Sequence, residues 1–142
     1  MTDKEIDELL AAHGYVMGGE GMRQALELIP SGLVPLMLFF ALDAERLMRE
    51  RRQRILLRHC VVARDGTLVL TLHYTCKRNE IWNLANQVAA VVRITSLMTC
   101  QRCADTSAGH VKGNLVLCKA CQEKIKQPDT AQALAEEQRQ CA

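Results

Sequence analysis

The chain has 142 residues and a formal net charge of +2, and 49% of its residues are hydrophobic while 24% are charged. This composition is ordinary for a folded protein and excludes a disordered or collagen-like chain. The length permits one domain with its own hydrophobic core and one small additional module.

Two patterns concern the location of the protein. The first ten residues are acidic and lack the basic stretch and apolar core of an export signal. The longest apolar run, residues 33–42, is too short for a membrane span and contains Pro35. We therefore expect a cytoplasmic protein without a membrane segment, in a reducing compartment where clustered cysteines usually bind metal.

Two short helices are predicted at the start of the chain. Thr2 and Glu5 have the spacing of a capping box, and apolar residues follow at helical spacing until Gly14, where we expect the first helix to end. After a glycine-rich turn, a second helix is predicted from Met22 to Pro30.

A third helix should begin near Pro35, whose missing N–H costs little in a first turn, and should reach about Arg52. Its first half, residues 33–42, is apolar on nearly every side, and its second half is heavily charged. We therefore expect one end to be buried or to bind a partner protein, and the other end to be exposed to solvent.

A β-hairpin is predicted over residues 55–75, because Asp65 and Gly66 separate two runs of β-forming residues. A two-residue type I′ turn would pair Arg64 with Thr67. The resulting hairpin would have one mostly apolar face, which we expect to pack against helices. This face would be formed by the pairs Ala63 with Leu68, Val61 with Leu70, His59 with Leu72 and Leu57 with Tyr74.

A fourth helix, capped by Asn79, is predicted to run through apolar positions at helical spacing directly towards Cys100. Its Trp82 and the hairpin residue Tyr74 are expected in the core or the hairpin. The residues after Pro128 have a helix-forming composition, but a segment so short and polar is a marginal helix without packing.

Four cysteines form the strongest motif in the sequence. Two CxxC pairs are separated by fourteen residues, which is the spacing of zinc ribbons and related zinc fingers. Each pair places two thiolates on one tight turn, and two facing turns supply the tetrahedral sulfur ligands that structural zinc prefers. We expect one structural zinc ion on Cys100, Cys103, Cys118 and Cys121.

The alternatives for these cysteines are a redox dithiol or two disulfides. His110 lies between the pairs and is a possible substitute ligand. Cys60 and Cys76 are interpreted as small buried hydrophobic residues, and Cys141 as a free thiol. An enzyme is not expected, since the chain has no phosphate loop, nucleophile elbow, HExxH or HxE motif, and four protein ligands leave no open position on the metal.

Positive charge is concentrated in the middle of the chain, because residues 43–78 sum to +5. A basic cluster of this kind can contact phosphates, and an equally good interpretation is a solvated helix end laced with salt bridges. The chain has five aromatic residues, so duplex phosphates or a protein surface are favoured over stacking on single-stranded bases. The candidate nucleic-acid contacts are Arg49, Arg51, Arg52, Arg54, Arg58, Lys77, Arg78, Lys112 and Lys119.

Three helices followed by a hairpin also have the order of a winged helix-turn-helix, with Arg64, Asp65 and Gly66 at the tip of the wing. A recognition helix presents polar residues to a DNA groove, whereas the third helix begins with residues 33–42, which are apolar. This pattern makes the winged-helix interpretation the weaker one.

The helix containing Trp82 and Arg93, followed by SLMTCQRC and LCKAC, resembles the zinc-binding region of FlhC-type flagellar transcriptional activators over residues 82–121. The chain is also similar in kind to small phage or plasmid regulators, including antiterminators that contact RNA polymerase and DNA. These resemblances imply a transcription factor that acts by contacts rather than by catalysis, with Cys100, Cys103, Cys118 and Cys121 as zinc ligands.

The sequence therefore predicts a mainly α protein with one β-hairpin (α+β) and a four-cysteine zinc module. The expected parts are a helical domain at residues 1–97, a zinc module at 98–127 and a tail at 128–142. The predicted function is transcription regulation through DNA or RNA polymerase, without a small-molecule substrate. The alternative is a phage- or plasmid-type adaptor that uses residues 33–42 and its zinc module to inhibit or redirect a host protein.

Overall fold

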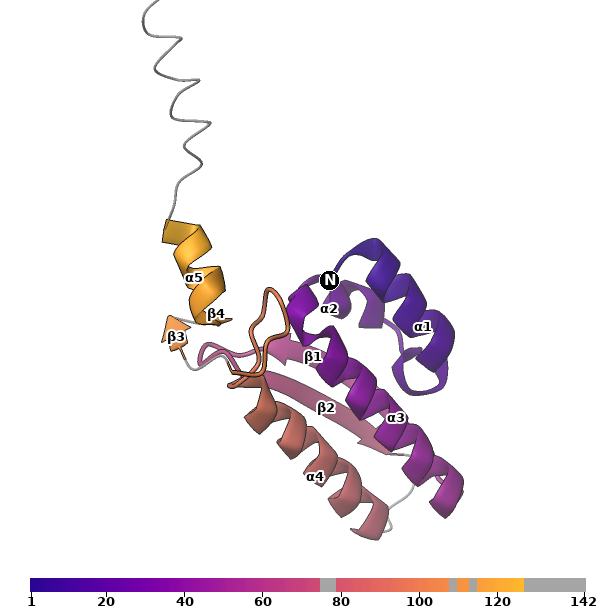
Figure 1. Cartoon of the computed structure of the whole chain (residues 1–142). Helices are drawn as coiled ribbons and strands as arrows, with labels where there is room; N and C mark the ends of the chain where they lie inside the picture. Colours follow the sequence, from indigo (N-terminus) through magenta and orange to yellow (C-terminus); the bar gives the residue numbers. More distant parts are fainter. Residues whose placement is uncertain (75–78, 108–109, 113–114, 127–142) are drawn as a thin grey trace, which may run out of the picture.

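The computed structural model describes residues 1–74, 79–107, 110–112 and 115–126 (Figure 1). Within these ranges it confirms the predicted fold class, a mainly helical α+β chain whose four cysteines cluster. The helices are α1 (Asp3–Met17), α2 (Met22–Glu27), α3 (Val34–Arg51), α4 (Asn79–Ser96) and α5 (Lys119–Lys126), with a 3-10 turn, η1 (Ser31–Leu33). The strands are β1 (Ile55–Val62), β2 (Leu68–Tyr74), β3 (His110–Lys112) and β4 (Leu115–Leu117).

Helix α1 begins with the predicted capping box. The Thr2 N–H donates to Glu5 Oε2 at 2.8 Å, and the Glu5 N–H donates to Thr2 Oγ1 at 3.3 Å. The predicted end at Gly14 is wrong, because the helix continues to Met17 across a kink at His13. The continuation buries Met17 completely, and this burial outweighs the low helix propensity of one glycine.

Helix α3 has the predicted bounds, with proline in its first turn. Leu36, Met37 and Phe40 are buried, so the inward side of the apolar segment belongs to the core. The helix ends at Arg52, whose φ of 50° is left-handed, the conformation that most often terminates helices and that usually falls on glycine. This residue turns the chain out of α3 and into β1.

The predicted hairpin is present, but its predicted turn is wrong. The N–H of Ala63 donates to the Thr67 carbonyl at 2.8 Å, which leaves a three-residue loop in place of a two-residue type I′ turn. Gly66 has a φ of 83°, and the Asp65 carboxylate accepts from both the N–H and the hydroxyl of Thr67. These local bonds favour the longer turn, and they shift the register by one residue.

A bulge in β1 shifts the register a second time. Leu57 pairs with Leu72, and His59 pairs with Thr71. The irregularity leaves both Arg58 and His59 exposed while Leu57 and Cys60 are both buried. The predicted inward face of β1 is therefore wrong at His59 and Val61, since a bulge inserts an extra residue into the alternation.

The inner face of the hairpin packs on helices. Helices α1 and α2 contact β1, and α4 contacts β2, while α3 packs against both α1 and α4 (Figure 1). The centre of the core consists of completely buried side chains contributed by all of these elements, among them Ile6, Met17, Leu26, Phe40, Ile55, Leu57 and Leu68. No helix in the described part of the chain is both long enough and apolar enough to cross a membrane.

The expectation that Trp82 lies in the core is wrong. Its side chain is 50% exposed, whereas Ile81 and Ala85 on the same helix are buried. Small and branched residues such as these form the inward face of α4, because α4 packs closely against β2 and α3. The described residues do not include Cys76, Cys141 or the predicted tail at 128–142, and the side chain of Tyr74 is not described either.

Candidate metal centre and arginine pocket

The structure brings the four predicted cysteines together. Their sulfur atoms all lie within 4.8 Å of one another, and the sulfurs of Cys103 and Cys118 are 3.6 Å apart. Four sulfurs bound tetrahedrally at about 2.3 Å from one zinc ion would be about 3.8 Å apart. The donor set and its spacing are therefore compatible with a single metal ion such as zinc.

Two backbone turns place these thiols. Cys100 and Cys103 lie on a turn in which the Ala104 N–H donates to the Cys100 carbonyl at 2.9 Å. Ala104 closes this turn with a φ of 64°. Cys118 follows β4 directly and precedes α5, so that Cys121 falls in the first turn of that helix.

The electrostatics of the group suit a cation. Burial raises the pKa of Cys100, but N–H groups of Cys118, Cys103 and Arg102 outweigh it and lower that pKa to about 6. Burial, together with the neighbouring thiols, raises the pKa of Cys121 to about 12. One thiol thus loses its proton readily, while further negative charge at the same place requires a compensating positive ion.

The described cysteines Cys60, Cys100, Cys103, Cys118 and Cys121 carry no disulfide. Cys60 lies apart from the four-cysteine group, with 2% of its surface exposed, and burial raises its pKa to about 11. Its sulfur contacts Met22 Sδ at 4.0 Å. The prediction that Cys60 is a small buried hydrophobic residue is confirmed, whereas the side chain of His110 lies outside the described residues.

Gln101 joins the first cysteine turn to three other parts of the fold. Its N–H donates to the carbonyl of Val116 at 2.8 Å, and its carbonyl accepts from the N–H of Gly32 at 2.9 Å. Its side-chain Nε2 donates to the carbonyl of Gly66 at 3.2 Å. The residue is 4% exposed. The cysteine turn is therefore fixed to β4, to η1 and to the tip of the hairpin at one point.

The basic residues that the sequence grouped together separate into several environments. Arg51 pairs with Glu80 at 3.6 Å, so its charge is partly compensated. Arg58 is exposed on β1, and Lys119 is exposed at the start of α5. Lys77, Arg78 and the side chain of Lys112 lie outside the described residues.

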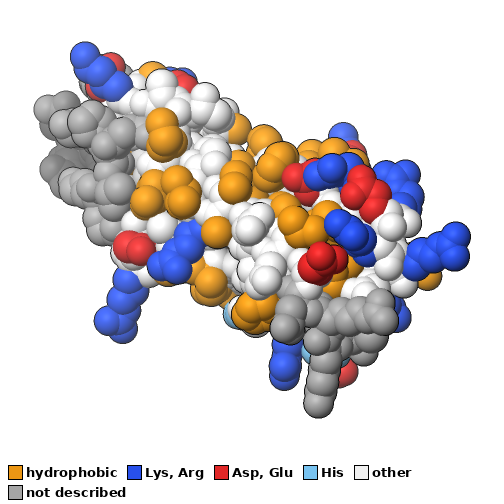
Figure 2. Space-filling model, turned by 90° about the horizontal axis from the view of Figure 1, so that it is seen from below, with side chains coloured by type: hydrophobic (Ala, Val, Ile, Leu, Met, Phe, Trp, Pro, Cys, Tyr) orange, Lys and Arg blue, Asp and Glu red, His pale blue; other side chains and the backbone are white. Residues whose placement is uncertain are grey.

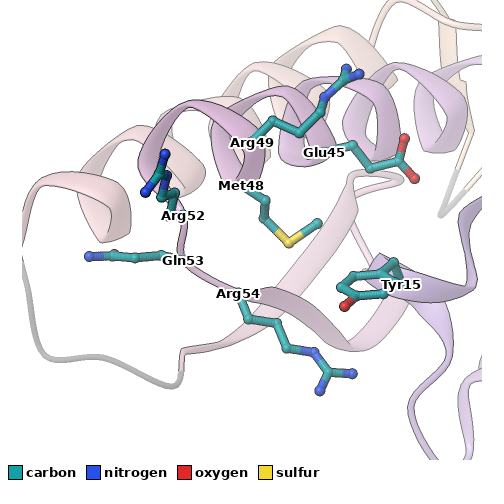
Figure 3. Close-up of a pocket in the computed structure, with 7 residues that line it drawn as sticks. All are labelled: Tyr15, Glu45, Met48, Arg49, Arg52, Gln53 and Arg54. Atoms are coloured by element: carbon teal, nitrogen blue, oxygen red, sulfur yellow. The ribbon is translucent and has the colours of Figure 1, made fainter.

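Arg49, Arg52 and Arg54 form a separate group at the end of α3. They line a pocket of about 490 Å³ together with Tyr15, Glu45, Met48 and Gln53 (Figure 3). In the described part of the chain, none of the three arginines makes an ion pair with a carboxylate. These arginines therefore keep their positive charge available at the surface.

Tyr15 is one of the residues of this pocket that the sequence did not indicate. Its ring is 73% exposed, and the guanidinium of Arg54 lies 5.6 Å from the ring centroid. It was missed because α1 was expected to end at Gly14, which would have left Tyr15 in a turn. The apolar Val16 and Met17 that follow were the available signal that the helix continues.

A second surface feature is apolar. Exposed side chains of α3 and α4 include Phe39, which is 43% exposed, and Ile94, which is 66% exposed. Figure 2 shows hydrophobic side chains gathered across the face seen from below, the side on which α4 and the lower end of α3 lie in Figure 1. The exposed large residues of these helices and of the turn after α4 are Leu38, Phe39, Leu42, Trp82, Val91, Ile94, Leu97 and Met98. The predicted 33–42 surface is thus divided between the core and exposed positions of α3.

Comparisons with known proteins gave no match to a family model, to a curated protein or to a solved structure.

Proposed function

We propose that the protein is a zinc-containing transcription regulator that acts by contacts with DNA or with RNA polymerase. One observation carries the nucleic-acid part of this proposal: Arg49, Arg52 and Arg54 share one surface and have no carboxylate partner among the described residues. Arginines placed in this way bind phosphate oxygens with charge-assisted hydrogen bonds.

The zinc in this proposal is structural. Four thiolates fill all four tetrahedral positions, so no position remains for a reacting water or substrate. Among the described residues of the module, the buried apolar cluster consists of Val116, Leu117 and three of the cysteines. A cluster of this size requires additional stabilisation, which a structural metal supplies.

Metal analysis tests the zinc. The purified chain should contain one zinc ion per molecule, and Cys103→Ser should lose it. Cys60→Ala is the matched control, because Cys60 is a cysteine outside the group. Cobalt substitution should give the absorption of a tetrahedral thiolate site in the control but not in Cys103→Ser. Full zinc content in Cys103→Ser would contradict the assignment of this ligand.

Titration against random duplex DNA at two salt concentrations tests the nucleic-acid contact. Binding should weaken steeply with salt, and replacing Arg49, Arg52 and Arg54 with glutamine should reduce the slope of log K against log salt by about 3. Arg46→Gln is the matched control, because Arg46 is already paired with Asp43 at 3.2 Å. The absence of duplex binding at low salt would contradict direct DNA contact.

A second function, that of a protein-interaction adaptor, is favoured by the exposed apolar face of α3 and α4. Large apolar side chains exposed on neighbouring helices can mark a binding site for a protein. Purified RNA polymerase distinguishes the two possibilities. If Ile94→Asp abolishes its binding while the triple glutamine variant binds normally, the protein acts as an adaptor through α3 and α4.

A further inference from the structure

The pocket at the end of α3 is an open surface hollow lined by three segments, of which α1 is distant in sequence from the other two. Tyr15 comes from the last turn of α1, Met48 from α3, and Arg54 from the residue before β1. Figure 3 shows the Met48 side chain extending from the helix into the space between Tyr15 and Arg54. A volume of about 490 Å³ is within the range of pockets that hold small organic ligands.

The charge of the pocket favours an anion. Three arginines line it against a single carboxylate, that of Glu45. Glu45 Oε1 is already in contact with the imidazole Nδ1 of His13 at 2.9 Å. Arg46, on the same helix, differs from the lining arginines because it is paired with Asp43 and Glu50. Three arginines without an ion pair among the described residues therefore line this one pocket.

Arg52 supplies an independent indication that its side chain matters at this place. It occupies the left-handed cap of α3 at a φ of 50°, where glycine would be accommodated without strain. A residue with a Cβ is strained in this conformation, and such strain concentrates at functional sites. An arginine therefore occupies a position where backbone conformation alone favours glycine.

The apolar part of the pocket suits a planar ring. The Tyr15 ring is largely exposed, and Met48 offers a flexible, polarisable thioether beside it. Arg54 lies over the Tyr15 ring, and guanidinium planes stack on bases as well as on aromatic side chains. Nucleobases are bound in proteins by this combination of aromatic and arginine side chains.

We propose that this pocket binds one nucleotide unit, with its base against Tyr15 and Met48 and its phosphate on the arginines at the pocket edge. Figure 3 shows the side chains of Arg49, Arg52 and Arg54 pointing in different directions, so these side chains must turn to reach one phosphate. The inference deepens the proposed function and rests on it, because it names the nucleic-acid component that the unpaired arginines bind. A free mononucleotide and a nucleotide within a single strand share this chemistry, and the experiment separates these two sources.

Calorimetric titration of the zinc-replete full chain tests the proposal. The probes are adenosine 5′-monophosphate, adenosine, inorganic phosphate and a short single-stranded oligonucleotide. The monophosphate should bind more tightly than adenosine or phosphate alone, because each of these lacks one half of the contacts. Tight binding of the monophosphate identifies a free nucleotide as the source, and binding of the oligonucleotide alone identifies a nucleotide within a strand.

Two variants of the pocket and one control complete the test. Arg52→Gly should weaken binding of the preferred probe about tenfold or more, while its thermal midpoint stays equal to or above that of the wild type. Tyr15→Leu should weaken the nucleotide or oligonucleotide but not inorganic phosphate. Arg46→Gln removes one charge from the same helix outside the pocket and should leave binding unchanged.

Three outcomes would overturn the proposal: no binding of either the monophosphate or the oligonucleotide, equal affinity for phosphate alone, or tighter binding of a phosphotyrosine peptide. Failure of the proposed function can be distinguished from failure of the pocket. Salt-dependent duplex binding without any binding of the monophosphate or the oligonucleotide would retain the DNA-binding function and reject the pocket. Nucleotide binding without duplex or polymerase binding would retain the pocket and reject that function.

Discussion

The side-chain Nε2 of Gln101 donates a hydrogen bond to the backbone carbonyl of Gly66 at 3.2 Å. This bond joins the first cysteine turn to the tip of the hairpin across 35 residues of sequence. Both partners are buried, so neither can exchange the bond for one to water. This glutamine amide therefore adds to the backbone bonds of Gln101 with Val116 and Gly32 in orienting the cysteine turn on the helical core.

Gln101→Ala is expected to destabilise the fold by about 1–3 kcal/mol, because the Gly66 carbonyl would remain buried without its donor. Chemical denaturation of the zinc-replete protein measures the change. Gln87→Ala, at an exposed position of α4, is the matched control and should change stability little. A loss of equal size in both variants would contradict a special role for Gln101.

Gly32→Ala is expected to be strongly destabilising and to weaken zinc binding. A Cβ at Gly32 would overlap the carbonyl oxygen of Cys100 and the backbone of Gln101, so the first cysteine turn would have to move. Gly14→Ala is the matched control, because a Cβ there meets nothing within 4 Å. It lies within α1 and should raise stability by about 0.5–1 kcal/mol. Normal zinc affinity in Gly32→Ala would show that this contact is not needed.

Ala104→Gly is expected to stabilise the protein by about 1 kcal/mol. Ala104 holds a left-handed φ of 64°, which strains a residue with a Cβ and not glycine. Ala90→Gly, at an exposed position within α4, should have the opposite sign, with a loss of about 1 kcal/mol. Thermal denaturation of the two zinc-bound variants against the wild type checks both signs, and a loss of stability in Ala104→Gly would contradict the strain.

Cys60 should make stability fall at high pH. Burial raises its pKa from 9.0 to about 11, so the unfolded chain releases this proton before the folded chain does. The contribution of the neutral Cys60 thiol to the free energy of unfolding is therefore fully present below pH 9. It is lost as the pH rises towards 11, and the total loss is about 3 kcal/mol. Cys60→Ala removes this dependence. The test is the difference in unfolding free energy between wild type and variant at several pH values, and a constant difference would contradict the prediction.

Elements with a strong local signal were predicted well from the sequence. The capping box of Thr2 and Glu5, the proline in the first turn of α3 and the presence of a hairpin around Asp65 and Gly66 each depend on neighbouring residues alone. The same is true of the two CxxC pairs, whose spacing indicates metal ligands before any fold is known. The clustering of the four sulfurs agrees with that spacing.

Details that depend on packing were not predicted. The register of the hairpin follows from the bonds of Thr67 to Asp65 and from a bulge that turns Arg58 and His59 outward together. The extension of α1 past Gly14 follows from the burial of Met17. In each case a tertiary contact or a nearby side-chain bond outweighs the local propensity.

The sequence by itself determined the fold class, the cysteine cluster and the presence of excess positive charge in the middle of the chain. Only the tertiary structure decided which arginines are neutralised and which are free for a ligand. The reason is that a charge is compensated by whatever lies next to it in space: Arg51 meets Glu80, 29 positions later in the chain, while Arg54 meets the ring of Tyr15. Such neighbours are set by the packing of α1, α3 and α4 and cannot be read from sequence spacing.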